Sequence, residues 1–334
     1  MPLCVADSKD RPHSPLDEDL LAPSPREDRG SERDAESAPP DAHGLPAGRH
    51  GRDYAVLAPP RTLGRCNNRG RRLESAALNE AERLHLGLCT VSERLAGALE
   101  GARFERREGY MFTAFPTFPL PSFNGVWAET DAAAVELGDA LAEVEELGLP
   151  FGVTVRAGRT PAVEDAARRL GLTSSMRIPG MVATPGELRV PESELLVIAV
   201  ETADGLAQAL AVAATGFGAP PELLASIYMI EVSELDGIEY YLGRVDRYDV
   251  STAVGYTVNG TVGIFNVATP EEYRGRGYGA TLTAHAAREG FNAGADLAWL
   301  QSSSMGESVY RRLGFREVEA YTLLTRSPEA SSSS

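Results

Sequence analysis

The sequence predicts a mixed α/β (α+β) fold, because segments with alternating apolar residues, typical of strands, are interspersed with segments of helical periodicity. The 334 residues allow two ordinary domains, and a hydrophobic fraction of 43% supplies a sizeable core. The Asn259-Gly260 pair between two strand patterns is a strong hairpin signal. The predicted strands and helices do not alternate regularly, so a simple βαβ repeat is not expected.

The N-terminal part combines a tail with a first group of elements. Residues 1–72 are predicted to be a disordered tail, because they are rich in Pro, Ser and charged residues and poor in apolar ones. Residues 329–334 are likewise expected to be frayed. Order is expected from residue 73, and residues 73–190 form the first predicted domain. Its expected elements are a helix at 75–99, strands at 123–128 and 151–156, a helix at 131–147 capped by Thr130 or Asp131, and a short helix from Pro161 to a cap at Gly171.

Pro191 marks the predicted start of a second domain, residues 191–328. Its expected strands and helices follow from the same periodicities and turn signals. They are a strand at 195–200, helices at 203–215 and 220–229, strands at 238–244, 250–258 and 261–268, a helix at 279–292, a strand at 297–301, a helix at 307–313 and a strand at 318–325.

Charge and composition exclude several classes of protein. A net charge of −16 disfavours binding to nucleic acid or to an acidic membrane, and would suit a cationic substrate such as an amine. There is no run of eighteen apolar residues, and the acidic, proline-bearing N-terminus is unlike a signal peptide. We therefore expect a cytoplasmic protein. Cys4, Cys66 and Cys89 lack a C-x-x-C spacing and are expected to be unpaired thiols, so no metal site is predicted.

A glycine-rich segment, Arg274 to Ala280, follows a predicted strand and precedes a predicted helix. Glycines allow successive backbone N–H groups to converge, and a helix N-terminus adds unpaired donors and partial positive charge, which together suit a pyrophosphate. A Rossmann G-x-G-x-x-G fingerprint fails, because Leu282 occupies the third glycine position. A nucleic-acid-binding RGG segment would recur within a basic chain. The spacing alone leaves a phosphate site and a simple glycine-rich turn as open alternatives.

The run from Gly263 to Ala280 resembles the cofactor motif of the GNAT N-acetyltransferase superfamily, a strand followed by R/Q-x-x-G-x-G/A. The element order from Leu195 onward also matches that family's fold, so the resemblance covers roughly 130 residues. It implies acetyl-CoA as co-substrate and a strand that splays from its neighbour to pair with the pantetheine arm. The implied cofactor-binding residues are Phe265, Asn266 and Val267 on the strand and Arg274, Gly275, Arg276, Gly277, Tyr278, Gly279 and Ala280 in the loop.

A second resemblance to this family spans Ser303 to Phe315. The family pattern is N-x-x-A-x-x-L-Y-x-x-x-G-F, in which Ser303 here replaces the asparagine that contacts the cofactor arm. The resemblance implies that Tyr310 is the general acid that protonates the leaving thiolate, and that a backbone N–H near Val267 stabilises the oxyanion. The glutamate often found on the family's motif strand is missing, which leaves Glu239, Asp246 or water as the general base.

The N-terminal part contains a weaker sequence similarity to the second of these motifs. Residues 167–172 (ARRLGL) align with residues 310–315 (YRRLGF), and at the same offset residues 131–137 fall on the glycine loop. This favours an internal repeat, with residues 73–190 a degenerate GNAT copy. Asp131 and Glu136 would bring negative charge to the phosphate position, and Ala167 has no phenol. A chance similarity of two α/β segments is the alternative.

These observations predict a tandem GNAT enzyme that transfers an acetyl group from acetyl-CoA to a primary amine by direct attack in a ternary complex. The acceptor would be a small-molecule or peptide amine, with no nucleic-acid or membrane partner. A CoA-binding regulatory module without turnover is the alternative. A third possibility is an enzyme similar to mycothiol synthase, but both halves of such enzymes can bind cofactor, and the first copy here lacks the glycines.

Overall fold

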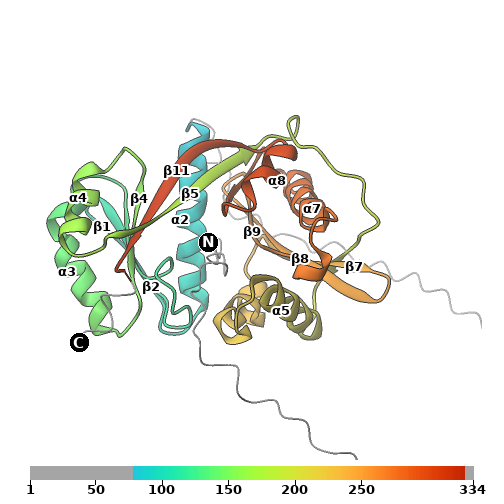
Figure 1. Ribbon diagram of the computed structural model, residues 1–334, viewed down its shortest axis with the longest axis horizontal. Coiled ribbons are helices and arrows are strands. Elements are labelled where there is room, and N and C mark those ends of the chain that lie inside the picture. The colour runs from blue at the N-terminus through green and yellow to red at the C-terminus, as the bar shows by residue number, and fades with distance from the viewer. Residues whose placement is uncertain (1–77, 328–334) are drawn as a thin grey trace, which may run out of the picture. The chain divides into compact units, whose positions relative to one another are not determined.

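The computed structural model describes residues 78–327 (Figure 1). The predicted tail, residues 1–72, and the predicted frayed end, residues 329–334, lie outside the described residues. Within 78–327 all strands form one mixed sheet of eleven strands. No helix of this range is long and apolar enough to cross a membrane.

The N-terminal group of elements begins with a long helix and contains five strands. Its helices are α2 (Glu80–Ala98), α3 (Ala133–Glu146) and α4 (Pro161–Arg169). Its strands are β1 (Arg103–Arg107), β2 (Tyr110–Ala114), β3 (Gly125–Ala128), β4 (Gly152–Arg156) and β5 (Ser174–Ala183).

The C-terminal group contains the other six strands. They are β6 (Leu196–Val200), β7 (Ile238–Val245), β8 (Tyr248–Val258), β9 (Thr261–Ala268), β10 (Leu297–Gln301) and β11 (Arg316–Thr325). The α-helices are α5 (Ala203–Phe217), α6 (Ile230–Ser233), α7 (Tyr278–Asn292) and α8 (Glu307–Arg312). Short 3₁₀ helices, η2 (Pro221–Leu223), η3 (Ala225–Tyr228) and η4 (Glu271–Tyr273), complete this group.

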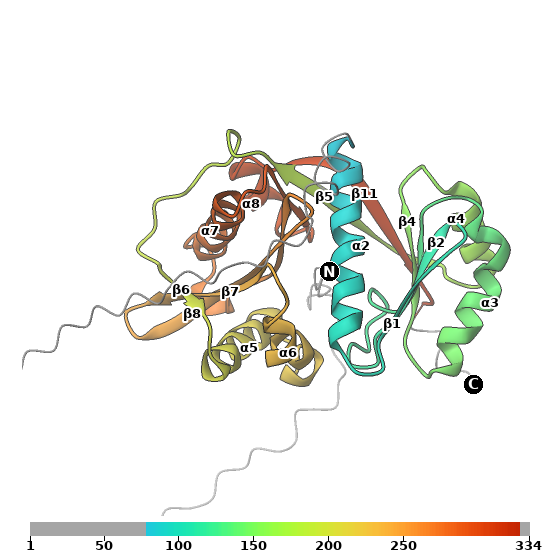
Figure 2. The same cartoon turned by 180° about the vertical axis from the view of Figure 1, so that it is seen from behind.

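The two groups exchange their last strands. The strand order is β1-β2-β3-β4-β11-β5-β10-β9-β8-β7-β6, so β11 pairs with β4 and β5 pairs with β10. At the centre β5 and β11 pair with each other in antiparallel orientation, from Ser174↔Thr325 to Val182↔Arg316. Figure 1 shows both strands running from one group of elements to the other, with α2 between the groups, and Figure 2 shows the same arrangement from behind.

One order of elements occurs twice. A strand and helix lead to a parallel neighbouring strand in β3–α3–β4 and again in β9–α7–β10. Each unit continues into a short helix and a long strand, α4–β5 and α8–β11. Both short helices end at a glycine with positive φ, Gly171 at 87° and Gly314 at 96°.

Helix α2 belongs to the core of both groups. Its apolar residues Leu84, Leu88, Val91 and Leu95 are buried in one cluster that also contains Trp299 of β10. A Cβ on Gly87 would lie 2.6 Å from the Trp299 ring, so the helix approaches β10 as closely as a glycine allows.

Most predicted elements are confirmed, with small differences at their ends. Three strands, β1, β2 and β5, were not predicted. Strand β1 is a charged edge segment, and β5 contains Pro179 and Gly180, which argue against a central strand. The proline is accommodated beside a register shift between Glu317 and Glu319 of β11.

Two local predictions were wrong. Residues 220–229 form two 3₁₀ turns rather than one helix, and the carbonyl of Ile227 accepts a hydrogen bond from the Tyr240 hydroxyl. Helix α3 starts after Ala132 without a side-chain cap. The carboxylate of Asp131, a predicted cap, instead accepts a hydrogen bond from the Ala162 N–H (2.9 Å) at the start of α4.

A buried ion network ties the exchanged strand to α2. The Arg156 guanidinium on β4 donates to Glu319 of β11 (Nε–Oε2, 2.8 Å) and, through both terminal nitrogens, to Glu82 of α2 (3.0 Å each). Arg156 and Glu319 are buried, and Arg159 closes the network by contacts to both glutamates. Removing one member would leave a buried charge uncompensated.

Acid should weaken this network through Glu82. The hydrogen bonds from Arg156 lower the pKa of Glu82 from 4.5 to about 2, with a further contribution from Arg159 and against the opposing effect of burial. A depressed carboxyl pKa contributes stability that is present above the unfolded value and lost as pH falls. The melting temperature of Glu82→Gln should therefore be lower than wild type at pH 7, and this difference should shrink between pH 4.5 and about 2. Exposed Glu100→Gln serves as control, and a difference for Glu82→Gln that is independent of pH would contradict the assignment.

Candidate active site

Strand β9 separates from β10 along its second half. The parallel pairing runs from Thr261↔Leu297 to Gly263↔Trp299, whereas β9 continues to Ala268. Beyond Trp299, β10 is paired on its other side with β5. The predicted separation of Phe265, Asn266 and Val267 from the neighbouring strand is therefore present, because the pairing with β10 ends before these residues.

A bulge in β9 reorients consecutive side chains. The register with β8 shifts between Thr252 and Val254, and Asn266 has a φ of 49°, in the left-handed region that non-glycine residues rarely adopt. Neighbouring strand residues normally face opposite sides of a sheet. Here Phe265 and Asn266 line the same cavity, while Val267 packs against the cluster on the α7 side.

The loop before α7 has the geometry of an anion cradle. Gly275 and Gly277 have φ values of 78° and 83°, and an added Cβ on either would meet no atom within 4 Å. The N–H groups of residues 275–280 have no acceptor within the described chain, as expected where a helix begins. Because these donors border open space at the positive end of α7, the loop fits a phosphate or pyrophosphate.

The arginine side chains of this loop hold its shape. Arg274 donates to the carbonyls of Thr269 (Nε, 3.0 Å) and Gly216 (Nη2, 2.7 Å), which ties the loop to the ends of β9 and α5. The Arg276 guanidinium lies 5.9 Å from the Tyr273 ring centre. Arg274 is therefore a positioning residue, and the donors that face the open space are backbone N–H groups.

The remaining loop residues pack inward. Tyr278 is buried, and its hydroxyl donates to Glu194 (2.8 Å). A Cβ on Gly279 would lie 3.4 Å from both Thr269 and Val267, so this glycine sets the close approach of α7 to β9. Ala280 packs at the edge of the same cluster.

The second predicted motif forms the turn into α8. The Ser303 hydroxyl accepts a hydrogen bond from the Gly306 N–H (3.2 Å) and so caps that turn. The Tyr310 ring is half-buried, lies edge-on to Phe315 at 6.2 Å, and packs so closely on Gly306 that an added Cβ would be 2.7 Å from it. Gly306, which replaces the family's alanine, thus makes room for the tyrosine.

The predicted residues fall on two faces of the sheet. Val267, Tyr278, Ala280 and Tyr310 belong to one cluster on the α7 face. Phe265 is part of the cluster on the opposite face, together with α2. These two sets of predicted residues lie closest along the part of β9 that is not paired with β10.

A small apolar cavity of about 30 Å³ adjoins the bulge. Its walls come from both groups of elements, and α2 contributes two of the residues from the N-terminal group. They are Val91, Leu95, Phe123, Ile227, Val232, Ile238, Val254, Tyr256, Phe265 and Asn266. The walls contain no carboxylate, and the volume is enough for a small group or a water molecule.

One buried polar atom of the cavity wall has no hydrogen-bond partner in the described chain, the Asn266 Oδ1. Buried polar atoms are normally paired, so it is available to a ligand or water. Tyr228 lies beside Asn266 and Thr252, and burial raises its pKa against their opposing effect, so its phenol stays neutral. Tyr228, Phe123 and α2 could not be assigned to this site from the sequence, because only the tertiary fold brings them to the bulge.

The two carboxylates considered as general bases do not line the cavity. Glu239 is exposed and accepts a hydrogen bond from the Tyr241 hydroxyl, on the face of β7 that packs on α7. Asp246 lies in the turn between β7 and β8, with a φ of 54°.

The comparisons with known proteins agree with this geometry. Residues 240–318 match a family model described as an acetyltransferase (GNAT) domain. No curated protein matches the chain.

Solved structures share the fold at low sequence identity. A GCN5-related N-acetyltransferase from Kribbella flavida is 22% identical with a TM-score of 0.56, over 73% of this chain and 96% of that one. A functionally unknown protein from Staphylococcus epidermidis is 14% identical with a TM-score of 0.52, over 68% and 94%. The described part of the chain thus has a GNAT-like mixed α/β fold, and the match to the acetyltransferase (GNAT) domain model lies within its C-terminal group of elements.

Proposed function

We propose that this protein is an acetyl-CoA-dependent N-acetyltransferase that acts on a primary amine. The observation that carries the proposal is the continuity of three features along one stretch of chain. The splayed half of β9, its bulge at Asn266 and the open glycine loop follow one another between residues 263 and 280. A GNAT domain match covers all three.

The loop would hold the pyrophosphate of acetyl-CoA. The N–H groups of Gly275 to Ala280 supply donors, and the α7 N-terminus supplies partial positive charge. Arg274 would keep the loop in place through its contacts to Thr269 and Gly216. The co-substrate supplies the activated acetyl group.

The splayed strand would orient the reacting end. Backbone groups of Phe265, Asn266 and Val267 lie along the gap that β10 leaves, which suits pairing with an extended pantetheine arm. A backbone N–H near Val267 would face the carbonyl oxygen as negative charge develops on it. Ser303, at the start of the α8 turn, would contact the same arm.

Tyr310 would protonate the leaving thiolate. Its ring is fixed by Gly306 and Phe315, so the hydroxyl has a defined position rather than a range of them. A neutral phenol beside a developing thiolate is a suitable general acid.

The acceptor amine would approach from the cavity side of β9. The walls there are apolar, so we infer an acceptor that carries a small apolar group next to its amine. The Asn266 Oδ1 would accept a hydrogen bond from the amine. Since no carboxylate lines the cavity, the amine's proton would leave through water rather than to Glu239 or Asp246.

The N-terminal group would be a degenerate GNAT copy that shapes the acceptor site. The repeated order of elements and the two Arg-Arg-Leu-Gly segments, each with a positive-φ glycine, support this reading. At the start of α3 the glycine loop is replaced by residues that include Asp131, whose carboxylate is bound to the start of α4. Val91, Leu95 and Phe123 line the cavity, which gives this copy a role without a cofactor of its own.

A CoA-binding module without turnover is the competing function, favoured by the absence of a carboxylate in the cavity walls. Incubation with acetyl-CoA and a panel of primary amines separates the two. Amines with a short branched alkyl group should be acetylated with kcat/KM at least about 10-fold above polyamines and aminosugars, because the apolar walls stabilise the alkyl group. Mass spectrometry of the products measures this. CoA binding without acetylation of any amine would favour the competing function.

A charge placed in the loop should block the cofactor. Gly277→Asp puts a carboxylate beside the pyrophosphate and should weaken CoA affinity roughly 10- to 100-fold more than Gly277→Asn. Asparagine has the same shape and tolerates the left-handed backbone, so it controls for strain at this φ of 83°. Titration calorimetry should also give one CoA per wild-type chain. An equal loss of CoA affinity in both variants would show that backbone strain, and not charge, weakens binding. Two CoA sites per wild-type chain would contradict a degenerate first copy.

The chemical role of Tyr310 can be tested apart from binding. Tyr310→Phe keeps the ring against Gly306 and Phe315 and removes only the hydroxyl. It should lower kcat by roughly 10² to 10⁴ with little change in CoA affinity. Steady-state and single-turnover kinetics provide the measurement. An unchanged kcat with chemistry rate-limiting would leave the ring with a packing role alone.

A further inference from the structure

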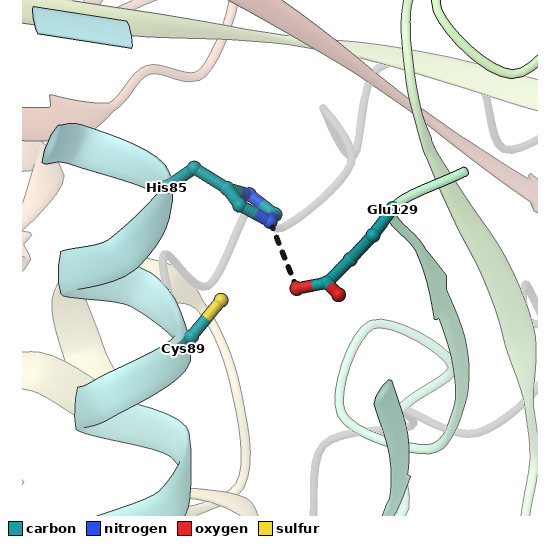
Figure 3. Close-up of side chains that lie close together, drawn as sticks. All are labelled: His85, Cys89 and Glu129. Carbon is teal, nitrogen blue, oxygen red and sulfur yellow. Dashed lines mark ion pairs between the residues drawn. The ribbon is translucent and has the colours of Figure 1, made fainter. Parts of the chain in front are cut away.

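Three metal-ligating side chains meet where α2 crosses the end of β3. His85 and Cys89 lie one turn apart on α2, and Glu129 directly follows β3 (Figure 3). One ligand atom from each residue lies within 4.8 Å of the other two. The His85 Nε2 is 3.6 Å from the Glu129 Oε1. Within the described residues no other group of this kind is present.

The histidine ring is buried and aimed into this group. His85 is only 6% exposed, and its buried Nε2 faces Glu129 at ion-pair distance but beyond hydrogen-bond distance. The other ring nitrogen, Nδ1, is 3.2 Å from the Tyr321 hydroxyl of β11. Metal-binding histidines typically have their second nitrogen held in this way, which fixes the ring and directs the free lone pair at the ion.

We propose that His85, Cys89 and Glu129 form a binding site for a divalent transition metal, zinc by its ligand chemistry. Thiolate, imidazole and carboxylate together are a donor set that zinc prefers, and calcium or magnesium would not select a thiolate. Bond lengths of about 2.0–2.3 Å place tetrahedral ligand atoms roughly 3.3–3.8 Å apart. The distance between the His85 Nε2 and the Glu129 Oε1, 3.6 Å, already falls in this range. The Cys89 Sγ lies within 4.8 Å of both atoms, so a movement of about 1 Å brings it into the same range.

Charge and access also suit a cation. A thiolate and a carboxylate carry two negative charges, which one divalent ion neutralises. Cys89 is buried, but the Glu129 side chain is 35% exposed and leaves a route from solvent for the ion and a water as fourth ligand. Arg106 is 3.8 Å from Glu129 and 3.7 Å from Glu93, and its side chain is 49% exposed, so it can turn to Glu93 when the ion binds. Arg156, the other cation nearby, is already paired with Glu82 and Glu319.

The rival explanation is an ion pair without metal. Burial lowers the pKa of His85, but the neighbouring Cys89 and Glu129 outweigh this and raise it to about 9. An imidazolium held by the carboxylate would satisfy both groups. A metal would do more, because it would cross-link α2 to β3 and so hold the helix that supplies Val91 and Leu95 to the cavity.

The test uses the full chain with Cys4→Ser and Cys66→Ser, so that Cys89 is its only thiol. After treatment with a chelator, Co²⁺ should bind at one equivalent, give a thiolate-to-cobalt charge-transfer band, and be displaced by Zn²⁺. Cys89→Ser should abolish the band. Glu129→Gln should weaken affinity by at least about 10-fold, and Glu100→Gln, at an exposed glutamate just after α2, should leave it unchanged.

Thermal unfolding gives an independent readout that does not depend on catalysis. Zn²⁺ at a hundredfold excess over its Kd should raise the melting temperature of the thiol-reduced background by about 5–10 °C and that of Glu129→Gln by less. Glu129 is partly exposed, so this variant should fold even where a change at buried Cys89 does not. Absence of a stoichiometric band, or a band that persists in Cys89→Ser, would overturn the proposal and leave the ion pair as the function of the group.

Discussion

The pairing of β5 with β11 is the contact on which the rest of the described fold depends. Each of these strands follows one group of elements along the chain but pairs with a strand of the other, β5 with β10 and β11 with β4. Hydrogen bonds therefore run without interruption across all eleven strands. The Arg156–Glu319 pair, buried at the β4–β11 boundary and joined to Glu82, adds an electrostatic constraint to the backbone pairing and fixes α2 on the same junction.

Helix α2 connects this junction to the candidate active site, because it contacts both. Its apolar face packs against β10 at Trp299, and Val91 and Leu95 on the same face line the cavity beside Asn266. The GNAT domain match begins only at residue 240, yet the cavity next to its motif strand is closed by residues far earlier in the chain. Residues of the N-terminal group thus form part of the cavity wall beside Asn266.

The conformation of the glycine loop could be predicted because its signal is local. Glycines at positive φ before a helix have the same meaning in almost any tertiary context, and Gly275 and Gly277 adopt it here. Strand β5 could not be predicted, because a proline and a glycine in sequence argue against a central strand that only its two neighbours stabilise. The cavity, the bulge at Asn266 and the cluster at His85 depend on contacts between distant segments, although the one-turn spacing of His85 and Cys89 was visible in the sequence.

The bulge at Asn266 explains how one strand can serve two ligands. A regular strand would alternate Phe265 and Asn266 between the faces, so only one of them could reach the cavity. The left-handed backbone at Asn266 places both on the cavity side and returns Val267 to the α7 side, next to the glycine loop. In the proposed reaction the acceptor and the cofactor would therefore contact adjacent residues of β9 from opposite faces. The edge of β9 beyond Gly263, which β10 leaves unpaired, lies between those faces, so we place acetyl transfer there.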